Sequence, residues 1–147
     1  MSYLAEAINQ YQRALLPILA ERLAGRSCEI QWRKPYISDF LALTAQGENG
    51  PIIQLDPDLS GAQLLRVFLH ELGHIRAGHA LPDHANHQKA PATWHLTDRE
   101  GFIAETQPRE AQADSWARYW LDFAERSAQG KSITALLAAL MTWRPLD

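Results

Sequence analysis

The stretch at residues 70–74, His70-Glu71-Leu72-Gly73-His74, decides how the rest of this 147-residue chain is interpreted. It lies in a segment with helical spacing of apolar residues. Two histidines four residues apart on a helix lie on nearly the same face, about 40° apart. Both imidazoles can therefore reach one metal ion, and Glu71 can hydrogen-bond a water on that metal. This pattern is typical of zinc hydrolases, so we expect Zn²⁺ held by His70 and His74, with Glu71 as the catalytic base.

The helix that carries this motif is expected over residues 60–79. Ser60 and Gln63 have the spacing of a capping box at its start, and Gly78 is a plausible end. Apolar side chains surround the motif and predict a largely buried helix. They are Leu64, Leu65, Phe68, Leu69 and Leu72.

A helix is also expected at the N-terminus, over residues 1–25. Apolar residues recur there at helical spacing, and Gly25 suits the end of a helix. Pro17 lies inside the pattern, where a missing N–H and a steric clash should kink or split the helix.

Three short strands are expected between residues 28 and 56. Residues 28–32 alternate apolar and polar, as a half-buried strand does. Residues 40–44 and 51–55 flank the turn Gly47-Glu48-Asn49-Gly50 and should form a hairpin. We therefore predict a small, about three-stranded, mainly antiparallel sheet. The strand Ile52–Leu55 directly precedes the motif helix, so it is either a buried strand or an edge that pairs with an extended substrate.

The remainder of the chain predicts a loop and two helices. Residues 80–107 have no clean period and contain prolines and histidines, so we expect a long loop or lid, with room for a short helix within it. A helix over 108–127 should begin at Pro108, and a last helix should span 131–143. The whole chain is then a single α+β domain, with helices packed on the sheet.

Catalytic zinc usually has three protein ligands and one water, so a third ligand is needed. Glu110 is our choice, because it lies early on the helix that follows the loop. Asp114 is four residues later on the same face and could accept the free ring N–H of a ligand histidine. The small residues Ala111 and Ala113 would let this helix pack closely on the motif helix. Without the upstream motif, the same spacing would describe an ordinary solvated helix face.

Other histidines remain alternatives as ligands. His79 follows the motif, but alanines occupy the positions where the metzincin pattern needs a glycine and a histidine. His84, His87 and His95 lie in the expected loop, where a solvated side chain is the simpler interpretation. The spacing of His95 is similar to that of the third histidine in SprT-like proteins. His95 and His79 stay open as ligands or as groups that stabilise an oxyanion.

Composition excludes several classes of function. The net charge of −3 gives no electrostatic argument for direct nucleic-acid binding. No apolar run approaches the roughly 20 residues that span a bilayer, and the N-terminus does not have the pattern of a secretory signal. Cys28 is the only cysteine, so an internal disulfide is impossible and a small core residue is expected. We expect a cytoplasmic protein without membrane partners.

Residues 52–79 together with 110–121 resemble the ImmA/IrrE family of metallo-endopeptidases. The family shows a strand, a short linker, a helix with H-E-L-G-H and then a helix of the form E-x-x-A-(N/D)-x-(F/W)-A. Here the second helix has Glu110-Ala-Gln-Ala-Asp-Ser-Trp-Ala117. The resemblance implies a gluzincin-like, zincin-type core with His70, His74 and Glu110 as ligands, Glu71 as base and Asp114 behind a ligand histidine. It also implies a helix-turn-helix repressor as protein substrate, and hence a role in transcription regulation.

Two other functions fit the same motif. The chain could be a metal-stabilised regulator that binds a protein without turnover. It could also be a non-peptidase, metal-dependent amide hydrolase, for which a deep closed pocket would be expected instead of an open cleft.

Overall fold

The computed structural model describes residues 2–34, 41–78, 99–130 and 132–145. For residues 2–9 and 99–107 only the backbone is described. Within these ranges no helix has the length and apolarity needed to cross a membrane. The elements are α1 (Ser2–Ala24), β1 (Glu29–Trp32), β2 (Ala42–Gly47), β3 (Gly50–Leu55), α2 (Gly61–Arg76), α5 (Arg99–Ser127) and α6 (Ile133–Leu140).

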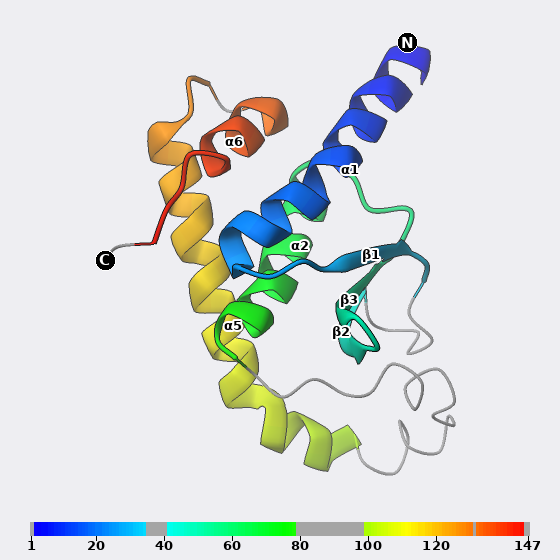
Figure 1. Cartoon of the computed structure of the whole chain (residues 1–147), viewed down its shortest axis with the longest axis vertical. Helices are drawn as coiled ribbons and strands as arrows, with labels where there is room; N and C mark the ends of the chain where they lie inside the picture. Colours follow the sequence, from blue (N-terminus) through cyan, green and yellow to red (C-terminus); the bar gives the residue numbers. More distant parts are fainter. Residues whose placement is uncertain (1, 35–40, 79–98, 131, 146–147) are drawn as a thin grey trace.

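Helix α2 occupies the centre of the fold. Figure 1 shows it between the sheet on one side and α5 with α6 on the other, while α1 crosses in front. Its apolar residues form much of the core, and Phe68, Leu69 and Leu72 are completely buried, as is Trp120 of α5. Burial of such side chains is the main force that holds an amphipathic helix in place. The expected burial of the motif helix is therefore confirmed.

The sheet has three strands, as expected, but it is mixed and not mainly antiparallel. Strand β3 lies in the middle; β2 pairs with it antiparallel through a tight turn, and β1 pairs with it parallel. The alternating pattern of a strand predicts which face is buried, but it carries no information on the direction of the neighbouring strand. Residues 52–55 thus lie in the central strand, and the suggestion that they form a substrate-binding edge is wrong.

Proline positions account for two further differences. Helix α1 continues through Pro17 without being split. Helix α5 begins at Arg99, so the predicted loop over 80–107 ends at least nine residues early, and Pro108 lies inside the helix instead of at its first turn. Figure 1 shows α5 bent, and a proline inside a helix is a common cause of a bend.

The sequence predicts the positions of the helix ends better than the capping interactions at those ends. Ser60 precedes α2, but its side chain makes no capping hydrogen bond, so the expected capping box is absent. Gly78 has a positive φ of 74°, which suits the residue that follows a helix end. The last helix is shorter than 131–143: Ser132 caps α6 by accepting a hydrogen bond from the backbone N–H of Ala135 at 3.1 Å.

Candidate metal centre

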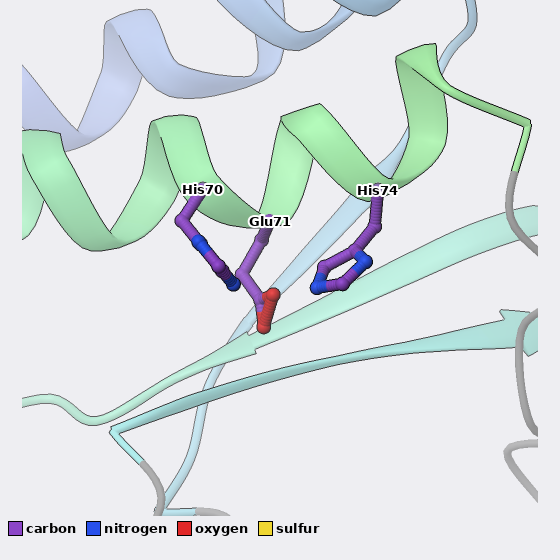
Figure 2. A group of neighbouring side chains, drawn as sticks. All are labelled: His70, Glu71 and His74. Carbon is purple, nitrogen blue, oxygen red and sulfur yellow. The ribbon is translucent and has the colours of Figure 1, made fainter. Parts of the chain in front are cut away.

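Helix α2 presents both motif histidines and Glu71 on one side. Figure 2 shows the three side chains leaving the helix together and pointing toward the neighbouring strands. The two imidazole rings lie edge to face, with their centroids 4.9 Å apart. This is the arrangement that the four-residue spacing predicts for a helix.

The other half of the site comes from α5. Glu110 Oε2 lies 2.6 Å from His70 Nε2, and Glu110 Oε1 lies 3.2 Å from His74 Nε2. Asp114 Oδ1 accepts a hydrogen bond from His70 Nδ1 at 2.7 Å. The two acidic residues of α5 therefore meet the same histidine at its two ring nitrogens. The contact of Asp114 with a motif histidine is the one expected, whereas Glu110 was expected on a metal ion and here meets the histidine directly.

The described residues could hold a metal ion in two ways. His70, Glu71 and His74 can each place one ligand atom within 4.8 Å of the others. Glu110, however, touches both Nε2 atoms. Ligands at about 2.0–2.1 Å from a tetrahedral zinc are roughly 3.3 Å apart. The separation of Glu110 from His74, 3.2 Å, is close to this value, whereas its separation from His70, 2.6 Å, is that of a direct hydrogen bond. Glu110 and Glu71 are thus both candidates for the third ligand.

Glu71 is 6% exposed and adjoins the two histidines. Burial raises the pKa of its carboxyl group above the ordinary value, and the charges of His74 and His70 oppose this shift. The buried hydroxyl of Thr44, on β2, also lowers this pKa, although Oγ1 has no hydrogen bond of regular geometry. A proton acceptor next to the metal position needs such a tuned pKa.

Thr44 is the neighbour of Glu71 that sequence reasoning missed. It lies in a strand whose adjacent residues, Leu43 and Ala45, are also buried. The only signal in the sequence is a hydroxyl residue between two apolar residues of a strand. This pattern does not indicate which side chain the hydroxyl contacts.

His70 and Glu110 form a charge-coupled pair. Burial lowers the pKa of His70, but the contacts with Glu110, Glu71 and Asp114 outweigh it, so the pKa is raised to about 9. Burial raises the pKa of Glu110, but hydrogen bonds from His70 and His74 outweigh it, so the pKa is lowered to about 2. Without metal, His70 is thus an imidazolium that donates from both nitrogens. A cation bound at Nε2 would replace one proton and keep the bond to Asp114.

Close packing of α2 on α5 brings these groups together. Gly73 is buried in the middle of the motif, and Ala113, which is completely buried, faces it from α5. Larger side chains at these positions would hold the helices apart and separate Glu110 from the histidines. The small residues expected at this interface are confirmed in this role for Ala113, whereas Ala111 is exposed.

The remaining candidate ligands cannot be placed. His79, His84, His87 and His95 all lie outside the described residues. A role for His95 or His79 as an alternative ligand or oxyanion group therefore stays a prediction.

Cys28 lies apart from this centre, at a cavity of about 810 Å³ beside β1 and the β2–β3 turn. Burial raises the pKa of its thiol to about 11. The thiol thus stays protonated near neutral pH, which disfavours a nucleophilic role. It packs partly buried against the core, close to the sequence expectation.

No protein-family model, curated protein or solved structure matches this chain. The functional argument therefore depends on the geometry of the metal centre itself.

Proposed function

We propose that this protein is a zinc-dependent endopeptidase. The observation that carries the proposal is the convergence of His70 Nε2 and His74 Nε2 on one carboxylate, Glu110, at 2.6 and 3.2 Å, next to the buried carboxyl group of Glu71. Two imidazoles and a carboxylate are a common ligand set of catalytic zinc, and they leave a fourth position for water or substrate.

Each residue then has a defined task. His70, His74 and Glu110 would hold the ion, and Asp114 would fix the orientation and tautomer of His70. Bound zinc would lower the pKa of a water and polarise the carbonyl of a scissile peptide bond. Glu71 would accept the proton of that water and later donate it to the amine nitrogen of the leaving product. Its raised pKa favours the second transfer.

A peptide substrate would bind along β2. Within the described residues, β2 pairs only with β3, so its other edge offers unpaired backbone groups. Strand β2 also supplies Thr44, which adjoins Glu71. An extended peptide added to this edge would run past the catalytic carboxylate, as in strand addition generally. The resemblance to ImmA/IrrE proteins suggests a helix-turn-helix repressor as the protein that contains this peptide.

The decisive experiment combines metal analysis with cleavage. The purified chain should contain about one zinc per molecule and should cleave the product of a neighbouring repressor gene. Glu71→Gln should keep the zinc but reduce cleavage by at least about a hundredfold, because a positioned general base contributes that much. Glu125→Gln, at an exposed position of α5, should leave both unchanged.

The other outcomes identify the alternatives. Undiminished cleavage by Glu71→Gln would contradict the proposed mechanism. One zinc per chain with binding, but no cleavage, of the repressor would indicate a metal-stabilised regulator. Hydrolysis of small amides without cleavage of any protein would indicate a non-peptidase hydrolase.

A further inference from the structure

A second cavity lies on the other side of the α2–α5 pair from the metal centre. It has a volume of about 430 Å³ and is lined by residues from the last turn of α2, from α5 and from the segment after α6. Arg76 lies about 160° around α2 from His74 and about 120° from His70. Gln112 lies about 160° around α5 from both Glu110 and Asp114. The cavity is therefore distinct from the metal centre, and its volume is in the range of small-molecule sites.

Aromatic rings form the walls of this cavity. Trp116 and Tyr119 of α5 meet edge to face with centroids 5.9 Å apart, and Tyr119 meets Trp143 in the same manner at 6.2 Å. Trp120 packs behind Trp116 and Trp143, at 5.3 and 5.9 Å, and is completely buried. Trp116 and Trp143 are thus supported from the core, and a flat apolar ligand would find aromatic surfaces to pack against.

One cation faces these rings. The Arg76 guanidinium lies 5.4 Å from the ring centre of Trp116 and 5.8 Å from that of Trp143. Arg76 is partly buried, yet in the part of the chain that the structure describes it forms no ion pair and no hydrogen bond. Ring faces attract a cation but do not accept its fork of N–H donors. A partly buried charge of this kind favours an anionic partner.

A purely structural role explains this arginine less well. Arg76 lies in the last turn of α2, where a cation suits the helix dipole, and close to Gly25 at the end of α1. Arg22 shows what a structural arginine does in this region: its Nε donates to the carbonyl oxygen of Trp143 at 3.2 Å. Arg76 has no such acceptor among the described residues, so its donors remain available to a ligand.

We propose that this cavity binds an aromatic carboxylate, with the carboxylate on Arg76 and the ring among Trp116, Tyr119 and Trp143. The guanidinium fork matches the two oxygens of a carboxylate, and the rings provide stacking surfaces for an aromatic body. The ligand is either a free aromatic acid or the C-terminal aromatic residue of a polypeptide, because both present the same groups.

The test is a pair of calorimetric titrations on the full chain, with N-acetyl-L-phenylalanine and with its C-terminal amide. The acid should bind at least about tenfold more tightly than the amide, since a charge-assisted pair is lost in the amide. The affinities of 3-phenylpropionate, a free aromatic acid, and of a peptide with a C-terminal phenylalanine are then compared. The probe that binds more tightly identifies which of the two sources supplies the ligand. Equal binding of acid and amide, or no heat from the acid at about 10 mM, would overturn the proposal.

Variants assign the binding to this cavity. Arg76→Gln should weaken binding of the acid by at least about tenfold, and Tyr119→Ala, at a 41% exposed position, should weaken it without unfolding the chain. Arg66→Gln is the matched control, because Arg66 is exposed on the same helix and does not line the cavity. Unchanged affinity in both Arg76→Gln and Tyr119→Ala would place the ligand elsewhere and contradict the proposal. Glu71→Gln should bind the acid normally, so this outcome is independent of the proposed peptidase activity.

Discussion

Gly73 of α2 faces the backbone of Ala113 of α5 so closely that a Cβ added to Gly73 would lie 2.5 Å from the Ala113 carbonyl oxygen and 2.9 Å from its Cα. Gly73→Ala should therefore push the helices apart. Overpacking against backbone costs about 1–3 kcal/mol, and the better helix propensity of alanine offsets at most about 1 kcal/mol. We expect a lower free energy of unfolding in urea and weaker zinc binding, because Glu110 moves with α5.

Gly61→Ala is the control for this prediction. Gly61 is the first residue of α2, and a Cβ there meets nothing within 4 Å, so the cost of the substitution is limited to the strain of a φ of 59°. Zinc affinity should be unchanged in this variant. An equal loss of zinc affinity in both variants would contradict the role assigned to the Gly73–Ala113 contact.

Glu71→Gln should stabilise the metal-free fold near neutral pH. The carboxyl group has a folded-state pKa raised by burial above its ordinary value of 4.5. For an acid with a raised pKa, the favourable contribution is present below the unfolded pKa and is lost as the pH rises. Ionised Glu71 therefore destabilises the fold at pH 7, and glutamine removes that charge. Thermal unfolding with chelator should show a higher Tm for the variant at pH 7 than for the natural chain, and a smaller difference near pH 4. A lower Tm at pH 7 would show that the carboxylate is stabilising.

Asp114→Asn should weaken zinc binding by about 10- to 100-fold, because the group that orients a ligand histidine contributes that much. Competition with a chelator of known affinity measures the change. Asp122→Asn is the matched control on α5: Asp122 is exposed and pairs only loosely with Arg126, at 3.8 Å. If Asp114→Asn kept full affinity, its hydrogen bond to His70 would have no part in metal binding.

The stability of the metal-free chain should depend on pH through His70 and Glu110. The pKa of His70 is raised from 6.5 to about 9, so its contribution is complete below pH 6.5 and is lost as the pH rises through 9. The pKa of Glu110 is lowered from 4.5 to about 2, so its contribution is present above pH 4.5 and is lost toward pH 2. The pair therefore stabilises most between pH 4.5 and 6.5. Urea unfolding at pH 5.5 and 9 should show a decline that Glu110→Gln reduces; an identical decline would contradict the pairing.

Local patterns predicted most of the individual elements. The motif helix, the N-terminal helix and the β2–β3 hairpin each have a period or a turn signal within a few residues of sequence. The spacing of Glu110 and Asp114 likewise predicted that both would lie on one side of α5. The contacts that they make with His70 agree with that expectation, whereas their binding of zinc remains a prediction.

Features that depend on contacts between distant segments were not predictable. The parallel pairing of β1 with β3 is one, because it is decided by packing and not by alternation. The early start of α5 is another: Pro108 suggested a first turn, but the residues before it also form helix. The aromatic cavity around Arg76 needs the chain after α6 to fold back on α5, and Trp143 alone gives no indication of this.

The pairing of α2 with α5 joins residues that are 40 positions apart along the chain, His70 and Glu110. A metal bound between them would be a reversible cross-link, whose entropic effect comes from closing the loop between the two helices. This entropy grows only slowly with length, by about 0.6 kcal/mol for each doubling of the loop. The intervening segment could thus be lengthened or replaced at little thermodynamic cost to the centre. Engineering can therefore change the length of that segment without altering the proposed ligands.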